Sequence, residues 1–210
     1  MTLKIERDGA IVIRVPEMTT KGEIDDFYRS KIPWISKQLK EHKETIAALA
    51  SPKRYVTGEN FLYLGDEYPL QHVENVHAGL ALSRGVFTLG RGSAQDGREA
   101  FIKWYKARAK EIFGRRVGHY SKLFNLVPRG IRVTSARSRY GSCSPGNNLS
   151  FSYRLVMAPY SVIDYIIVHE LAHIKIKNHS KHFWEFMAEL MPDYRQHKLW
   201  LKKKGHLLEI

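Results

Sequence analysis

The sequence has almost no cysteine and no long apolar run. Among its 210 residues there is one cysteine, Cys143, so the chain cannot form an intramolecular disulfide. Its apolar clusters, the longest around residues 162–168, fall short of the roughly 20 residues that a transmembrane helix needs. The opening Met-Thr-Leu-Lys-Ile-Glu-Arg lacks the apolar core of a secretory signal. We therefore expect a cytoplasmic protein without a membrane partner.

Acidic residues are also scarce, and most of all in one stretch. The chain has 34 Lys and Arg against 21 Asp and Glu, a net charge of +13. Residues 102–140 hold eleven Lys or Arg and one acid, Glu111, so +10 of this charge lies there. Such a run is either a solvated helix face or an electrostatic footprint for phosphate. The second interpretation predicts that residues 102–140 contact nucleic acid or a nucleotide.

The remaining composition and the apolar pattern predict one core built from strands and long helices. Hydrophobic residues make up 43% of the chain and charged residues 26%, close to the average for globular proteins. Alternation around Asp8-Gly9 predicts a hairpin, and short apolar runs between residues 54 and 89 predict a β-meander. Helical periodicity predicts a helix from Thr20 that is kinked or broken at Pro33. The other expected elements are a helix over 98–124, strands over 131–134 and 149–152 that bracket a turn-rich loop at 138–148, and helices over 159–177, 180–191 and 194–204.

Residues 169–173 read His-Glu-Leu-Ala-His inside a predicted helix that is apolar nearly all round. The spacing puts His169 and His173 on one helix face, where two neutral imidazoles can reach one zinc ion. Glu170 projects beside that face. So short a pattern also occurs by chance, but two histidines and a glutamate are costly to bury without a metal or polar partners. The context therefore favours a zinc site.

A catalytic zinc usually has three protein ligands and leaves a fourth position for water. His179 is the expected third ligand, because Asn178 tolerates the left-handed conformation that lets a chain turn back. His182 is its only nearby rival. We prefer His179, since His182 directly precedes Phe183 and a tryptophan, whose bulk we expect to pack the next helix onto the first.

These residues predict hydrolytic chemistry. Zinc lowers the pKa of its water from 15.7 towards about 7, and Glu170 accepts the proton so that the water can attack a polarised carbonyl. Glu170 then delivers the proton to the leaving amine. One zinc ion is the expected cofactor, although other divalent transition metals suit the same ligands.

Three segments together resemble one known family. They are His169-Glu-Leu-Ala-His-Ile-Lys-Ile-Lys-Asn-His179-Ser-Lys-His-Phe-Trp184, Ser138-Arg-Tyr-Gly-Ser-Cys-Ser144 and Tyr153-Arg-Leu-Val-Met-Ala-Pro159. The chain resembles the YgjP-like metallopeptidase family, which is related to the SprT-like and WLM zinc metalloproteases. The resemblance implies an HExxH peptidase with a protein or peptide substrate, His169, His173 and His179 as metal ligands and Glu170 as general base. It also implies that residues 131–152 edge the cleft.

The resemblance and the predicted elements together indicate an α+β fold. We expect a zincin-like metallopeptidase core with an N-terminal β-hairpin and meander and long helices. Residues 1–95 form the predicted N-terminal β-rich and helical region, and residues 96–210 the predicted catalytic region, the two making one compact unit. Metzincins have the same histidine spacing but place glycine where this chain has Ile176, so the turn after the helix must differ.

The loop before residue 144 has two interpretations. In the functional one, Arg139 and Ser142 bind substrate, with Arg139 holding an acidic group, and Cys143 lies close to the metal. In the structural one, the segment is only a tight turn, and Cys143 is a small buried hydrophobe.

Two other functions stay open. A metal-dependent nucleoside triphosphate pyrophosphatase would use the same activated water, but the sequence has no acidic cluster or glycine-rich phosphate loop to support it. A nucleic-acid-binding module with a structural zinc would need a fourth protein ligand, for example Cys143.

Overall fold

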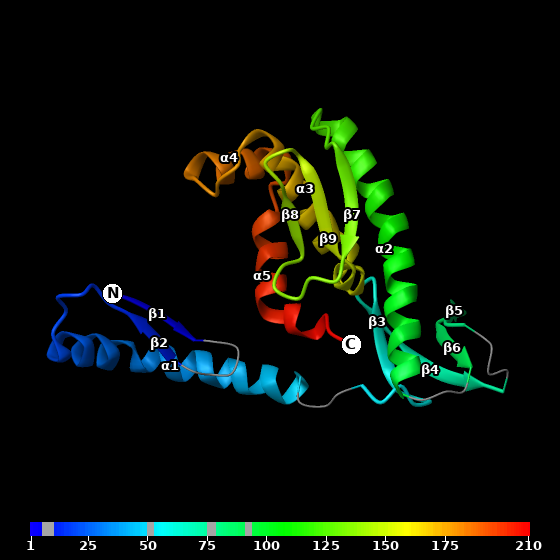
Figure 1. Ribbon diagram of the computed structural model, residues 1–210, viewed down its shortest axis with the longest axis horizontal. Helices are drawn as coiled ribbons and strands as arrows, with labels where there is room; N and C mark the ends of the chain where they lie inside the picture. The colour runs from blue at the N-terminus through cyan, green and yellow to red at the C-terminus, as the bar shows by residue number, and fades with distance from the viewer. Residues whose placement is uncertain (6–10, 50–52, 75–78, 91–93) are drawn as a thin grey trace. The chain divides into compact units, whose positions relative to one another are not determined.

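A computed structural model describes residues 1–5, 11–49, 53–74, 79–90 and 94–210 (Figure 1). The chain forms two compact units, Met1–Pro52 and Lys53–Ile210. Helices and sheets are mixed, so the predicted α+β class is confirmed, while the division at residue 95 stays a prediction. Within the described residues, none of the helices combines the length and the apolarity that a membrane crossing requires.

The first unit is a hairpin followed by one long helix. β1 (Thr2–Ile5) pairs antiparallel with β2 (Ile11–Arg14), which confirms the predicted hairpin, although its Asp8-Gly9 turn lies outside the described residues. α1 (Lys21–Leu49) runs through Pro33, so the predicted break is absent from this helix. A proline removes only one backbone donor, and the long helical segments on either side of it keep theirs.

Four strands open the second unit. They are β3 (Asn60–Tyr63), β4 (Asp66–Val73), β5 (Ala81–Ser83) and β6 (Val86–Gly90), in the order β3-β4-β6-β5. β6 is parallel to β4, so the predicted β-meander is wrong in its connections. The physical reason is Phe87 of β6, which is fully buried and whose ring centre lies 5.0 Å from that of Phe101. Phe87, Leu89 and Gly90 of β6 are all buried, whereas no residue of β5 is, so β6 takes the inner position and β5 the edge.

α2 (Ala94–Phe124) is the long helix predicted over 98–124. One side of it carries the expected apolar stripe, because Phe101, Tyr105, Ala109, Phe113 and Val117 are all buried. The stripe joins the four-stranded sheet to the rest of the second unit, since these side chains belong to one continuous core.

A second, three-stranded sheet lies alongside α2. Its strands are β7 (Gly130–Thr134), β8 (Gly141–Cys143) and β9 (Asn148–Ser152), in the order β7-β9-β8. The prediction of a loop over 138–148 is therefore corrected, because part of it is the edge strand β8, which pairs antiparallel with β9. A turn in which Asn147 N donates to Ser144 O (3.0 Å) closes this hairpin.

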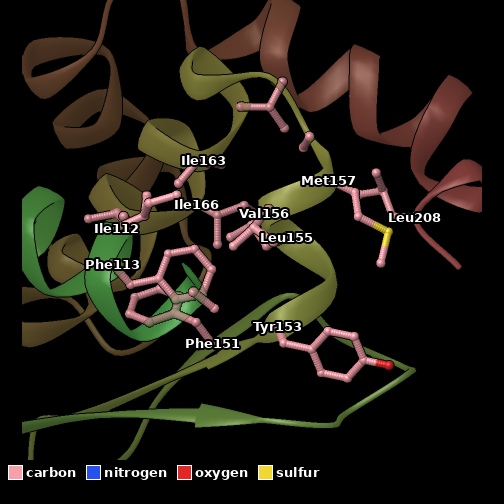
Figure 2. Packing of buried hydrophobic residues seen from close by; sticks show 14 of the residues in the cluster. Ile112, Phe113, Phe151, Tyr153, Leu155, Val156, Met157, Ile163, Ile166 and Leu208 are labelled. Atoms are coloured by element: carbon pink, nitrogen blue, oxygen red, sulfur yellow. The ribbon is translucent and has the colours of Figure 1, made fainter. Parts of the chain in front are cut away.

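The end of the chain is helical, and α3 is the most deeply buried of its three α-helices. The elements are the short 3₁₀ helix η1 (Tyr153–Met157), α3 (Tyr160–Lys175), α4 (Lys181–Leu190), α5 (Tyr194–Lys204) and the 3₁₀ helix η2 (Gly205–Leu207). Residues 162–168 of α3 are all buried, as predicted. Figure 2 shows the core that η1 shares with its neighbours, with Phe113 of α2 against Phe151 of β9 and Met157 beside Leu208.

An ion pair inside this packing joins α2 to α3. Arg116 donates from both Nε and Nη2 to the carboxylate of Asp164, and Nη2 also donates to the Tyr120 hydroxyl (3.1 Å). The Asp164 side chain is only 11% exposed. Its charge therefore depends on Arg116 for compensation.

We predict that Arg116→Met destabilises the protein by about 2 kcal/mol, because it leaves the Asp164 carboxylate buried without a cation. The expected loss of stability is smaller than the loss on breaking a fully buried ion pair, because 31% of the Arg116 side chain is exposed. Urea unfolding measures the difference. Arg115→Met is the matched control: Arg115 is 65% exposed and pairs with Glu111, so its loss should change stability by less than about 0.5 kcal/mol. Equal losses in the two variants would contradict the prediction.

Candidate metal centre

Three imidazoles meet at the C-terminal end of α3. His169 and His173 lie one turn apart on the helix, and His179 returns to them from the turn before α4. His179 Nε2 lies 3.0 Å from His169 Nε2 and 3.2 Å from His173 Nε2. Among the described residues these three are the only group whose donor atoms converge closely enough to share a metal ion. No fourth histidine, cysteine or carboxylate of the described chain belongs to the group.

The turn after α3 brings His179 back without the conformation that the sequence suggested. Ile176 caps the helix in an extended conformation (φ −129°, ψ 107°), which needs no glycine. Asn178 does not have a positive φ, so the left-handed conformation predicted for it is wrong. Its side-chain oxygen instead accepts a hydrogen bond from Ser180 N (3.2 Å). Ser180 then caps α4 by accepting from Phe183 N.

The rings are held in place by one hydrogen bond and by aromatic packing. His173 Nδ1 lies 2.9 Å from Ile176 O, so Nδ1 carries the hydrogen and Nε2 offers its lone pair to the group. His169 Nδ1 is buried and has no hydrogen-bond partner in the described structure. Phe183 orients these rings instead: its ring centre lies 4.5 Å from that of His173 and 5.0 Å from those of His169 and His179.

The electrostatics of the centre favour neutral imidazoles. Burial, together with the two neighbouring imidazoles, lowers the pKa of His169 to about 3. Burial also lowers the pKa of His173. Histidine must be uncharged to bind a metal. Three converging Nε2 donors, two of them on imidazoles whose pKa is lowered, therefore fit a transition metal such as zinc.

Glu170 is buried beside this centre and touches β8. Only 5% of its surface is exposed. Its carboxylate accepts a hydrogen bond from Cys143 N, and it lies so close to Gly141 that a Cβ there would stand 2.6 Å from Glu170 Oε1. Burial raises the pKa of Glu170 to about 7, although the charge of Arg139 and the Cys143 amide partly oppose this. The carboxylate can therefore gain and lose a proton near neutral pH.

β8 is an edge strand of its sheet, and its outer edge lies next to Glu170. Ser144 N donates to Asn148 O (2.9 Å), so the even-numbered residues of this hairpin bond to β9. By alternation, the backbone groups of Gly141 and Cys143 point away from β9. The Cys143 amide reaches Glu170 in this way. Sequence reasoning missed this edge, although the glycine and the turn residues before β9 were available signals.

The two predicted substrate residues lie at β8 and line one small hollow. Arg139 is exposed just before the strand, and its charge acts on Glu170. Ser142 alternates with Gly141 and stands opposite Ser150, so its side chain faces away from Glu170. Their roles in substrate binding stay predictions.

Cys143 stands near the centre but outside the ligand group. Its Sγ lies 3.5 Å from Ser144 O and 3.7 Å from Lys177 Nζ. Burial raises the pKa of its thiol, and Lys177 opposes that rise. Cys143 Sγ therefore contacts Ser144 and Lys177 and is not part of the group of converging metal donors.

A lysine beside the histidines was also missed by sequence reasoning. Lys198 Nζ of α5 lies 3.8 Å from the ring centre of Trp184, and that ring stacks on His179 at 5.6 Å. After burial and the neighbouring imidazoles, the charge of Lys198 further lowers the pKa of His169. Nothing in the local sequence of α5 separates Lys198 from its other lysines.

We predict that His179→Ala abolishes zinc binding and that His182→Ala does not. His179 supplies one of three converging donors, whereas the His182 side chain is 75% exposed on α4. The loss should exceed the roughly 10- to 100-fold that removal of an outer partner costs. Metal content after dialysis and calorimetric titration with zinc measure it. Retention of one tight zinc per chain in the His179 variant would contradict the assignment.

We predict that Glu170→Gln stabilises the metal-free protein at neutral and alkaline pH. An unfolded glutamate titrates near 4.5, whereas burial raises the pKa of Glu170 to about 7 in the fold. Below pH 4.5 Glu170 is protonated in both the folded and the unfolded chain, and the folded protein loses no stability there. Between pH 4.5 and 7 the unfolded chain ionises first, so the free energy of unfolding falls, by about 3 kcal/mol once the pH is above 7. Urea unfolding in chelator across this pH range should show the variant gaining over the wild type. Glu185→Gln, at an exposed position, should show the same change of unfolding free energy with pH as the wild type. The prediction would be contradicted by a Glu170→Gln variant whose stability changes with pH as the wild type's does.

Comparison with known proteins identifies a family for the chain. A family model described as YgjP-like, metallopeptidase domain, matches residues 1–204. A similar solved structure is the crystal structure of the metallopeptidase zymogen of Pyrococcus abyssi abylysin, which is 17% identical. The match covers 43% of this chain and 93% of that chain, with a TM-score of 0.38. A search of curated proteins finds no match.

Proposed function

The chain belongs to the YgjP-like metallopeptidase family, and on this premise we propose that it is a zinc-dependent peptidase with Glu170 as its general base. The observation that carries the proposal is one constellation: three imidazole donors that converge, and the buried carboxylate of the residue next to the first of them. The proposed ligands are His169, His173 and His179. Family membership supports a metal-dependent peptidase in general; the zinc and the role of Glu170 are our proposal.

Glu170 is well placed to move a proton. When bound, zinc would polarise the scissile carbonyl and acidify a water. Glu170 would accept a proton from the attacking water and later give it to the leaving amine nitrogen. A base is most effective when its pKa lies near the working pH, and burial supplies that by raising the pKa of Glu170 to about 7. The Cys143 amide and the missing side chain at Gly141 would keep the carboxylate in place.

The proposed substrate is a protein or peptide in an extended conformation. β8 is an edge strand beside Glu170. Its Cys143 amide is bonded to the Glu170 carboxylate, and the backbone groups of Gly141 also lie on the outer edge. An extended segment can add to such an edge through main-chain hydrogen bonds. This would bring a peptide bond next to the carboxylate without requiring a particular side chain. Arg139, exposed before β8, would favour substrates with an acidic group there.

The geometry weighs against the two other functions. A structural zinc needs a fourth protein ligand, and the described residues bring only three donors together. Triphosphate hydrolysis usually uses magnesium held by carboxylates, and no acidic group of the described chain joins the histidine group. These observations favour an open catalytic site that suits zinc.

The decisive experiment compares wild type and Glu170→Gln at equal zinc content. We expect the variant to keep one zinc per chain, because the three imidazoles are intact, and to lose at least about 100-fold in hydrolysis of an unfolded protein substrate. Proteolysis is followed by release of labelled peptides, and zinc by elemental analysis. Glu189→Gln, an exposed substitution on α4, is the control and should retain full activity.

Other outcomes would overturn the proposal in distinct ways. Hydrolysis of nucleoside triphosphates that disappears in Glu170→Gln, with no proteolysis, would identify a pyrophosphatase. Zinc that resists exchange, with no hydrolysis of either substrate by either protein, would identify a structural site. Proteolysis that survives the substitution unchanged would remove Glu170 from the mechanism.

A further inference from the structure

We propose that a groove between α2 and β7 binds the phosphodiester backbone of a nucleic acid. α2 runs alongside β7, which is an edge strand of its sheet (Figure 1). Between them lies a hollow of about 540 Å³ lined by Lys106, Lys110 and Gly114 of α2 and by residues 131–135. We call this hollow the α2–β7 groove. It lies within the basic stretch 102–140, to which it gives a specific shape.

The lining of the α2–β7 groove holds three cations and no acid, beside the apolar Ile131 and Val133. Lys106, Lys110 and Arg132 are exposed, and within the described part of the chain none of them forms an ion pair. Glu111 is the one acid of the basic stretch, and it pairs with Arg108 (3.0 Å) and with Arg115 (3.4 Å) outside the groove. The positive charge of the groove is therefore uncompensated.

A second, smaller hollow extends this surface over the sheet. It has a volume of about 90 Å³, and it shares Arg132 and Thr134 with the α2–β7 groove. It continues to Arg139 and to the hydroxyls of Ser142 and Ser150. Arg132 Nε donates to Ser150 Oγ (2.7 Å), which fixes the guanidinium between the two hollows. The surface therefore extends beyond one anion site and suits a chain of anions.

The chemistry of the lining selects nucleic acid among polyanions. Lysine, arginine and hydroxyl side chains are the usual donors to phosphate oxygens. A nucleic acid carries one phosphate per nucleotide at regular spacing, so successive phosphates of one strand can meet the cations of both hollows. No aromatic ring lines the groove, so stacking on bases has no platform there. We expect contacts to phosphates alone and therefore no sequence preference.

Gly114 allows a test by a single change of charge. It lies in the groove wall on α2, and a Cβ at this position would meet nothing within 4 Å. Glycine also has a lower helix propensity than glutamate or glutamine, so replacing Gly114 by either residue should not destabilise α2. Gly114→Glu would put a carboxylate into the groove, and Gly114→Gln would add the same bulk without the charge.

Fluorescence anisotropy with short labelled DNA, single-stranded and duplex, tests the proposal on the full chain. We expect Lys106→Gln/Lys110→Gln/Arg132→Gln to weaken binding about tenfold or more and to reduce the slope of log K against log salt by about 2 to 3. Gly114→Glu should weaken binding, and Gly114→Gln should match the wild type. Lys202→Gln/Lys203→Gln/Lys204→Gln removes the same charge from the exposed end of α5 and should keep most of the affinity. Circular dichroism confirms that each variant is folded.

Four results would overturn the proposal. These are equal losses in the two triple variants, equal binding by Gly114→Glu and Gly114→Gln, displacement of DNA by polyglutamate of matched charge, and displacement by a nucleoside triphosphate at similar concentration. The third would identify an acidic protein as the occupant, and the fourth a mononucleotide. Binding is measured without hydrolysis, so the result is independent of the proposed peptidase activity.

Discussion

The second unit depends on the burial of α3 more than on any other interaction. This helix is apolar nearly all round, yet Asp164, Glu170 and His173 are each less than 10% exposed. A buried polar group costs free energy unless it finds a partner. Each of the three has one: an arginine from α2, a backbone amide from β8 and a backbone carbonyl in the following turn. The contacts around the centre therefore offset the cost of burying these three polar side chains.

Much of this could be predicted because the relevant signals are local. A spacing of four places His169 and His173 on one face of any helix, whatever surrounds it. Apolar periodicity gave the extent of α2, and alternation around a turn gave the first hairpin. The convergence of His179 follows from its short separation from α3, although the turn uses an extended Ile176 where we had expected a left-handed asparagine.

The rest depended on contacts between residues distant in the sequence. β6 lies beside β4 because it is more buried than β5, and a run of short strands does not reveal that order. β8 has only three residues, and its pairing with β9 is what makes it a strand. The close approach of Gly141 to Glu170 joins residues 29 positions apart. Periodicity carries no information on such pairs.

The three-stranded sheet separates two kinds of chemistry by alternation alone. Gly141 faces Glu170, and Ser142, the next residue, faces the opposite side with Ser150 and Arg132. Because side chains alternate with a period of two, a shift of β8 by one residue would exchange these faces. It would put a side chain where Glu170 needs open space and remove a hydroxyl from the basic surface. The register of β8 against β9 therefore controls both the carboxylate and the polar face, and the buried Leu149 and Phe151 of β9 fix that register by facing the core.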